Sequence, residues 1–296
     1  MKIVHTFDDV RSVSVGSVGL VPTMGFLHEG HLSLVGAANE QNDTVVVSVF
    51  VNPLQFNDVS DHDAYPRDLD RDAALAEGAG ADVLFAPDVS HMYPSEQRAT
   101  VTVAHVAEGM EGAHRPGHFV GVATVVAKLL AGVRPDNAYF GRKDAQQLAV
   151  VTTMARDLSF PTCIGGLTTV RESDGLALAS RNVRLDPDLR ESALKLSEAL
   201  FDAADAFEAG QRSAEALIRI AVERLAAGRD LHVDYVEVAR AVDAGSIATI
   251  DTESFLALAA RVGDVRLIDN VHLDPDTGAA DRGTRLTTPS ILYGGS

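Results

Sequence analysis

The feature that most constrains the fold is a run of β-branched and apolar residues at positions 44–51, with the sequence Thr-Val-Val-Val-Ser-Val-Phe-Val. A strand with one face in water alternates apolar and polar residues, whereas this run is apolar at almost every position. That pattern is typical of a strand buried on both faces of a parallel sheet. Shorter strand patterns occur at residues 18–21, 81–86, 137–140 and 161–167.

Helical patterns lie between these strands, at residues 70–78, 119–133 and 144–157. Strands that alternate with helices build βαβ units, whose strands pair in parallel. We therefore expect the first part of the chain to be an α/β domain with a Rossmann-like parallel sheet.

The pattern changes after about residue 173. Two helical patterns are followed by three strand patterns, at residues 187–209, 213–227, 231–239, 254–261 and 265–272. The sequence Val262-Gly263-Asp264 suits a hairpin turn between the last two strands. We expect a smaller α+β domain, with a boundary near residue 170 that gives domains 1–170 and 171–296. The tail at 274–296 is rich in Gly, Thr and Asp, and we expect it to be partly mobile.

The formal net charge of −17 narrows the choice of partners. Nucleic-acid binding needs clustered Lys and Arg, so we expect no nucleic-acid partner, whereas a small phosphorylated ligand needs only a local positive site. The single cysteine, Cys163, excludes an intrachain disulfide and lies in an apolar run, so we expect it in the core. We predict no secretory signal and no apolar run long enough to span a bilayer, hence a cytoplasmic protein without a membrane partner.

The sequence Pro-Thr-Met-Gly-Phe-Leu-His-Glu-Gly-His, at residues 22–31, lies between a strand pattern and a helical pattern. A helix start has unpaired backbone N–H groups and the positive end of the helix dipole, so it attracts anions. His28 and His31 are three residues apart and share one helix face. The segment therefore suits a polyphosphate, although the two histidines could also be solvated residues or half of a metal site.

The HxGH string is the phosphate-binding signature of a nucleotidyltransferase superfamily, and the longer string at 22–31 resembles that of the pantoate–β-alanine ligases. Three more strings recur in that family's order, at residues 50–56, 139–147 and 169–182. The resemblance covers most of the chain and is densest before Asn182.

The resemblance implies an ATP-dependent ligase that joins pantoate to β-alanine in two half-reactions. The pantoate carboxylate attacks the α-phosphorus of Mg·ATP, which gives pantoyl adenylate and releases pyrophosphate. The amine of β-alanine then attacks the acyl carbon, which releases pantothenate and AMP. The resemblance also implies that domain 1–170 binds ATP and pantoate, that domain 171–296 closes over the active site, and that the enzyme is a homodimer.

The catalytic positions of the family match His28, His31, Lys143 and Arg181, and His31 is our candidate proton donor. Its pantoate and β-alanine positions match Gln55, Gln147 and Asn52, neutral polar side chains that follow strands or start helices. The positions that bind ATP match a larger set: Met24, Gly25, Phe26, Leu27, His28, Glu29, Gly30, His31, Gly141, Arg142, Lys143, Asp144, Val170, Leu178, Ala179, Ser180 and Arg181. The counterparts of Glu111 and Arg115 support the site.

The chain departs from the family pattern at three positions. The family has an acidic pair where this chain has Arg71 and Asp72, so only Asp72 remains as a candidate Mg²⁺ ligand, and it could equally be a helix-start residue. Ala179 replaces a hydroxyl residue in the loop that closes on the triphosphate. The family usually has Glu at Arg142, a side chain that we expect to face outward.

Two other classes of function remain open. The chain could be a different HxGH adenylyltransferase, a hypothesis that the string at 50–56 and Gln147 oppose. It could also be a nucleotide-binding regulatory module without catalysis, as Ala179 and Arg71 would allow and as Lys143 and the histidines oppose. An aminoacyl-tRNA synthetase would need a basic surface for tRNA, which the net charge of −17 opposes.

Overall fold

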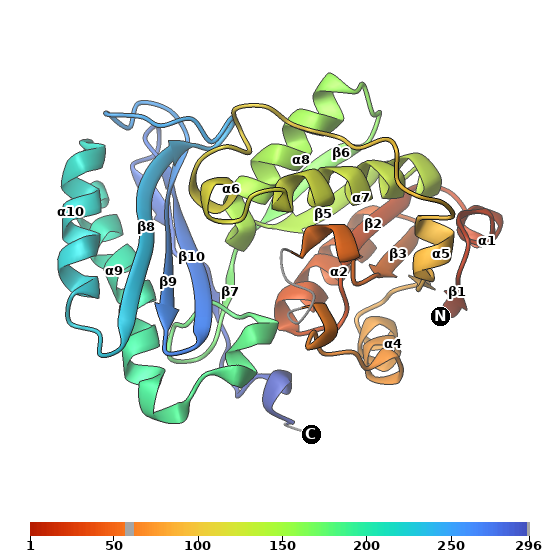
Figure 1. The fold of residues 1–296 in the computed structure, drawn as a ribbon, viewed down its shortest axis with the longest axis horizontal. Helices are drawn as coiled ribbons and strands as arrows, with labels where there is room; N and C mark the ends of the chain where they lie inside the picture. The colour runs from red at the N-terminus through yellow and green to blue at the C-terminus, as the bar shows by residue number, and fades with distance from the viewer. Residues whose placement is uncertain (57–61, 295–296) are drawn as a thin grey trace. The chain divides into compact units, whose positions relative to one another are not determined.

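A computed structural model describes residues 1–56 and 62–294 and divides the chain into two compact units (Figure 1). Unit 1 consists of Met1–Ala107, Arg115–Gly141 and Val150–Leu167. Unit 2 consists of Glu108–His114, Arg142–Ala149 and Thr168–Ser296. Two short segments from the first half of the chain therefore belong to unit 2.

In the described part of the chain, unit 1 holds a six-stranded parallel sheet with the order β1-β4-β3-β2-β5-β6. Its strands are β1 (Lys2–Val4), β2 (Val18–Thr23), β3 (Thr44–Val49), β4 (Val83–Phe85), β5 (Asn137–Gly141) and β6 (Cys163–Leu167). This confirms the Rossmann-like α/β prediction.

Helices cover the sheet of unit 1, and both of its faces are buried. Leu20 and Val21 point to opposite faces, yet neither side chain is exposed, which explains the continuous apolar runs. On one face α2 (Glu29–Gln41) and α4 (Leu69–Gly78) pack on a cluster that includes Val21 and Val47. Helix α7 (His118–Val133) packs against β2 and α1 (Phe7–Val13) and is apolar almost all round, as expected of a buried helix. The unit also contains α5 (Val89–Met92).

The strand order of unit 1 reverses between β2 and β5. From β2 the chain proceeds through β3 and β4 in one direction, whereas β5 and β6 extend the sheet in the other. Open parallel sheets bind ligands beyond the carboxyl ends of their strands at such a point. Strand β2 ends at Thr23, just before the histidine turn, and β5 ends at Gly141.

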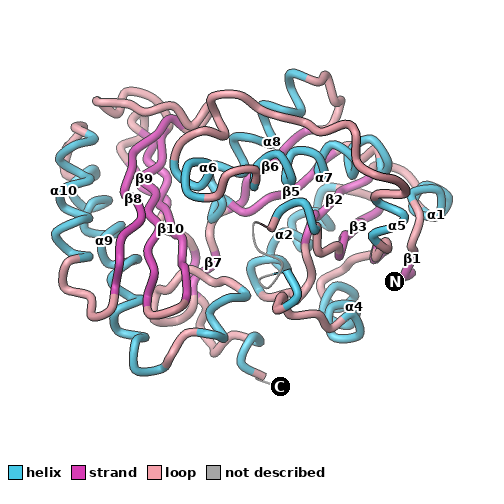
Figure 2. The backbone as a smooth tube through the Cα atoms, viewed as in Figure 1, coloured by secondary structure: helices cyan, strands magenta, loops and turns pink. Residues whose placement is uncertain are grey.

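Unit 2 is built on an antiparallel sheet with the order β11-β10-β9-β8 among its described residues. Figure 2 shows its long strands β8, β9 and β10 side by side. Alternate residues of β9 point to opposite faces, and both faces are covered. Leu256 and Leu258 belong to a core formed with the two long helices, whereas Phe255 and Ala257 pack with Met110 on the other face. The elements are α6 (Met110–His114), α9 (Arg190–Glu208), α10 (Ala214–Leu225), β8 (Leu231–Arg240), β9 (Ser254–Val262), β10 (Val265–Asp274) and β11 (Ala279–Asp281).

Helix α8 (Ala145–Asp157) begins in unit 2 and ends in unit 1. The predicted helices and strands appear within a few residues of their expected bounds, and the hairpin turn between β9 and β10 is confirmed, with Gly263 at a φ of +55°. None of the helices among the described residues is long and apolar enough to cross a membrane.

In the tail, β11 pairs with β10 and β12 (Thr284–Arg285) pairs with β7 (Val170–Arg171), and its partial mobility stays a prediction. One expectation is wrong. Cys163 is exposed rather than in the core. It is the first residue of β6, which is an edge strand, so within the described part of the chain it has a neighbouring strand on one side only.

Candidate active site

The turn after β2 has a backbone conformation that requires glycine. Gly25 has a φ of +85° and Phe26 a φ of +51°, both in the left-handed region. A Cβ atom at Gly25 would lie 2.9 Å from Oδ2 of Asp72 and 2.9 Å from Cγ1 of Val49. This turn lets the backbone of residues 24–27 lead directly into helix α2.

His28 and His31 together cap the start of α2. Nδ1 of His28 accepts a hydrogen bond from the Gly30 N–H at 3.2 Å, and Nδ1 of His31 accepts one from the His28 N–H at 3.4 Å. The ring centroids lie 4.0 Å apart. Because both Nδ1 atoms accept, each neutral ring has its proton on Nε2, which is then a hydrogen-bond donor. Donors at a helix N-terminus suit a polyphosphate.

Asn52 holds the turn that carries Gln55. Asn52 is 1% exposed, and its Oδ1 accepts from the Tyr93 hydroxyl at 2.8 Å and from the Leu54 N–H at 3.3 Å. Its Nδ2 donates to the Gly121 carbonyl at 3.1 Å. These contacts give Asn52 a structural role, and its predicted contact with pantoate stays a prediction.

Gln55 ends the short helix η1 (Pro53–Gln55), which packs against α7. A Cβ at Gly121 would overlap the Leu54 carbonyl, so glycine is what allows η1 to lie this close to α7. Nδ1 of His118 lies 3.0 Å from the Gln55 carbonyl oxygen. The Gln55 side-chain amide has no hydrogen-bond partner among residues 1–56 and 62–294, so it can bind a ligand.

In unit 2, the Lys143 backbone is held by a side chain from β10. Nδ2 of Asn270 donates to the carbonyl oxygens of Arg142 at 2.9 Å and Lys143 at 2.7 Å. Nζ of Lys143 lies 3.9 Å from Oδ1 of Asp144, the last residue of η2 (Arg142–Asp144). The Arg142 side chain is 39% exposed, and its guanidinium forms a 3.3 Å ion pair with Asp281.

Two adjacent glutamines at the start of α8 have different environments. Gln146 is buried, and its amide accepts from the Glu111 N–H at 3.0 Å and donates to the Gly109 carbonyl at 2.9 Å. Gln147 is partly exposed, and its amide has no hydrogen-bond partner in the described part of the chain. Of the two, Gln147 is therefore the one that can bind a substrate.

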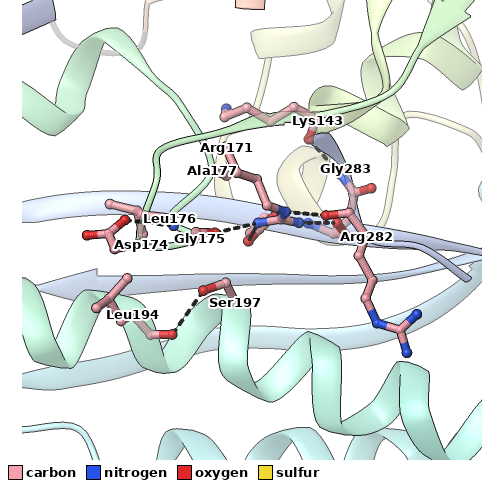
Figure 3. A network of polar contacts seen from close by, with 12 residues as sticks. Lys143, Arg171, Asp174, Gly175, Leu176, Ala177, Leu194, Ser197, Arg282 and Gly283 are labelled. Atoms are coloured by element: carbon pink, nitrogen blue, oxygen red, sulfur yellow. Dashed lines mark hydrogen bonds and ion pairs between the residues drawn. The ribbon is translucent and has the colours of Figure 1, made fainter. Parts of the chain in front are cut away.

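The segment at Val170 and Arg171 is fixed by a buried network (Figure 3). Arg171 is completely buried and forms a two-pronged ion pair with Asp269, at 2.6 and 3.0 Å. Its guanidinium also donates to the carbonyl oxygens of Asn270, Gly175 and Arg282.

Sequence reasoning missed Asp269, Asn270 and Arg171. The available signal was the pair Asp269-Asn270 in the middle of an otherwise apolar strand. Polar residues at such positions are buried only when they have partners.

The predicted triphosphate loop follows this network in sequence. The Leu178 N–H donates to the Val170 carbonyl at 3.0 Å, which leaves that oxygen a second lone pair for a ligand. Helix η3 (Ser180–Arg184) begins after Ala179, whose methyl group cannot cap it as a hydroxyl could. The Asn182 amide donates to the Ala177 carbonyl at 3.0 Å and steadies the loop.

The supporting residue Glu111 has a structural environment. Its carboxylate receives two hydrogen bonds from Arg266, at 2.8 and 2.6 Å, and one from the Tyr235 hydroxyl at 3.2 Å. Burial and the Glu111 charge raise the pKa of Tyr235 well above its usual range, so its hydroxyl stays protonated as a donor. These contacts tie α6 to strands β8 and β10.

Unit 1 holds a histidine-capped helix start at the reversal point of a parallel sheet, together with the Gln55 amide. Unit 2 holds the lysine turn and the Gln147 amide. These features define an HxGH enzyme that uses a nucleotide. The family model for pantoate-beta-alanine ligase matches residues 2–272. The chain therefore belongs to the pantoate–β-alanine ligase family, and it is an ATP-dependent ligase of pantothenate biosynthesis.

Individual relatives agree with this assignment. The chain is 51% identical to a pantothenate synthetase of Moorella thermoacetica over 280 residues, which cover 93% of this chain and 99% of that one. Its structure resembles the pantothenate synthetase of Thermus thermophilus, with a TM-score of 0.87 and 46% identity over 91% of this chain and 98% of that one. A pantoate–β-alanine ligase of Francisella tularensis, complexed with beta-gamma ATP and beta-alanine, has a TM-score of 0.75 and 34% identity over 91% of this chain and 97% of that one.

Proposed function

We propose that this enzyme condenses pantoate with β-alanine through a pantoyl adenylate, with the two histidines of α2 and Lys143 acting on the phosphates of ATP. The close pair of His28 and His31, with ring centroids 4.0 Å apart, is the observation that carries the proposal. Each ring uses Nδ1 to cap the helix, so each has a fixed tautomer and directs its Nε2–H as a donor. No nucleophilic side chain is needed, because the pantoate carboxylate is itself the nucleophile.

In the first half-reaction the carboxylate oxygen of pantoate bonds to the α-phosphorus, and the bond from that phosphorus to the bridging oxygen breaks. Pyrophosphate leaves with the electrons of that bond. His28, His31, Lys143 and Arg181 stabilise the negative charge that develops on it. His31 is the proton donor in its imidazolium form, in which Nδ1 also carries a proton and no longer accepts from the His28 N–H. Catalysis of this kind depends on positioning and on charge neutralisation.

In the second half-reaction the amine of β-alanine attacks the acyl carbon of the adenylate, and AMP leaves. Gln55 and Gln147 hold pantoate through their amides. The loop at Ala179, Ser180 and Arg181 keeps water from the adenylate, which hydrolysis would otherwise destroy.

Magnesium enters with ATP as Mg·ATP, the form in which we propose that the nucleotide binds. The chain's candidate ligand, Asp72, does not fit a protein-held ion, because both of its carboxylate oxygens accept backbone hydrogen bonds. The neighbouring guanidinium of Arg71 lies 3.5 Å from Asp72 and would repel a cation. No step of the proposed mechanism therefore passes through a protein-held metal.

We also propose that the enzyme is a cytoplasmic homodimer. Its exposed Cys163 thiol suits a reducing compartment. Light scattering coupled to gel filtration would give the mass of the assembly, and a mass equal to one chain would exclude the dimer.

The reaction is tested by supplying ATP, pantoate and β-alanine together and separating the products. We expect AMP, pyrophosphate and pantothenate, with no pyrophosphate formed when pantoate is left out. Formation of ADP and phosphate would exclude an adenylate. Pyrophosphate formation with another acid in place of pantoate would favour a different HxGH adenylyltransferase.

A further inference from the structure

Asp72 lies at the end of the first turn of α4, directly against the histidine turn. Its place follows from the sequence, because Asp68 caps α4 through a 3.0 Å hydrogen bond from the Arg71 N–H to its carboxylate. With the start of α4 fixed in this way, the Asp72 side chain lies inside the protein, where it is only 1% exposed. A carboxylate this deeply buried needs partners to stay ionised.

The partners of Asp72 are two consecutive backbone N–H groups of the histidine turn. Its Oδ2 accepts from the Phe26 N–H and its Oδ1 from the Leu27 N–H, each at 2.7 Å. These distances are typical of strong, charge-assisted hydrogen bonds. Only a carboxylate offers two equivalent acceptor oxygens with this geometry, whereas an asparagine offers one.

Arg71 contacts the same turn at groups that Asp72 does not bind. Its Nη1 donates to the Leu27 carbonyl at 2.9 Å, and its guanidinium lies 4.8 Å from the centroid of the Phe26 ring. Donor and acceptor groups of the turn are therefore both engaged by neighbouring residues of α4. Residue 28, which begins the histidine cap, follows immediately.

We propose that Asp72 and Arg71 form a clamp that fixes the backbone of Phe26 and Leu27, and that Asp72 is a positioning residue for His28 and His31 rather than a metal ligand. The clamp sets the direction in which the chain enters α2, and hence where the N-terminal N–H groups and the two rings lie. This inference rests on the proposed function only in that the positioned groups bind ATP.

Burying an ionised carboxylate costs free energy, and this cost supports a function for Asp72. Burial raises the pKa of Asp72 above that of an ordinary aspartate, even though the Leu27 and Phe26 N–H groups and the Arg71 charge lower it. A neutral side chain would avoid this cost, but it would leave one backbone N–H without its partner.

The clamp is tested with Asp72→Asn, and Asp70→Asn is the matched control. Asp70 lies in the same first turn of α4 but is exposed, so both variants lose one negative charge. Hydrogen exchange of the Phe26 and Leu27 amides is measured without substrates, together with KM for ATP and the Mg²⁺ concentration that gives half-maximal activity.

In Asp72→Asn we expect amide exchange at Phe26 and Leu27 to be about 10- to 100-fold faster, because one charge-assisted hydrogen bond is lost. KM for ATP should rise by a similar factor, with no change in the Mg²⁺ requirement. Asp70→Asn should match the wild type. A raised Mg²⁺ requirement, or rescue by excess Mg²⁺, with unchanged amide exchange would overturn the clamp and make Asp72 a metal ligand.

Arg71→Leu tests the clamp even if Asp72→Asn does not fold. We expect exchange at Phe26 and Leu27 to be about 3- to 10-fold faster, because the Leu27 carbonyl loses its donor while the stem still packs. Wild-type exchange at both amides would contradict the clamp. The exchange measurement needs no catalysis, so a wild type that makes no pantothenate would refute the proposed function without deciding this inference.

Discussion

Two of the turns that carry predicted ATP-binding residues are held in different ways. In unit 1, Asp72 accepts from the backbone of the histidine turn at the edge of one helix, beside a partly exposed Arg71. In unit 2, Asn270 holds the backbone of Lys143, and behind it lies the completely buried pair of Arg171 and Asp269.

The two arrangements differ in how the protein responds when one partner is removed. A carboxylate that binds backbone N–H groups fixes a few residues locally, so its removal changes the conformation of that turn alone. A buried ion pair is costly to desolvate and adds little net stability, yet removal of one partner leaves an unpaired charge in the core. We therefore expect changes in unit 1 to affect ligand binding and changes in the unit 2 network to affect folding.

The largest effect is expected at the histidine cap. His31→Ala should lower the rate of pyrophosphate formation by about 10²- to 10⁴-fold, because a general acid is lost from the transition state. His31→Gln separates the two roles of the ring, since glutamine at this position can still complete a capping box. We expect His31→Gln to keep the melting temperature of the wild type but the low rate of His31→Ala. Wild-type turnover in either folded variant would show that the ring serves only as a cap.

The next effect is on the stability of unit 2. Arg171→Met should lower the free energy of unfolding by about 3–5 kcal/mol, because Asp269 is left buried without its partner. The double variant Arg171→Met/Asp269→Leu removes both charges and should recover most of the loss. Urea denaturation measures each value. A double variant as unstable as the single one would show that the guanidinium matters for its carbonyl contacts instead.

A smaller effect is expected from pH. Burial, aided by the Arg142 charge, lowers the pKa of His272 in β10 from 6.5 to about 4. Between these pH values the unfolded chain binds a proton that the folded chain does not, so stability falls as the pH is lowered through this window. The total loss should be on the order of 3 kcal/mol. In His272→Gln this part of the slope of unfolding free energy against pH should vanish, and an unchanged slope would assign it to other groups.

The smallest effect is expected from the two binding amides, one in each unit. Gln55→Ala and Gln147→Ala should each weaken pantoate binding by about 0.5–1.5 kcal/mol and leave ATP affinity nearly unchanged. Gln146→Ala is the matched control, because its amide binds Gly109 and Glu111 and should affect stability instead. Calorimetric titration of each variant with ATP and with pantoate measures the two affinities separately. Weakened ATP binding with unchanged pantoate binding would reverse our placement of the substrates.

The sequence predicted the sheet of unit 1 well, because strands buried on both faces leave a continuous apolar signal that needs no tertiary information. It also predicted the histidine turn, since strand, glycine and helix start are local features. The role of Asp72 could not be predicted in this way. Its partners Phe26 and Leu27 lie 46 and 45 residues away in the chain, and an aspartate in a first helical turn has a sufficient local explanation.

Which strands lie at the edges of the sheets also could not be predicted from local sequence patterns. Cys163 lies in an apolar run, but whether a strand is central or at an edge depends on the strand order, which periodicity does not contain. The short strands β11 and β12 carry almost no apolar signal and exist because β10 and β7 offer free backbone groups to pair with.

Gly121 in α7 has a consequence for how this enzyme tolerates variation. The absence of a single carbon atom lets the helix lie on the Leu54 carbonyl, and so sets how closely η1 and its last residue, Gln55, pack against α7. Alanine, ordinarily the mildest replacement in a helix, would push this short segment outward as surely as a larger residue would. Random mutagenesis with selection for growth without pantothenate should therefore retain glycine at position 121. The exposed positions of α10 should accept many substitutions under the same selection.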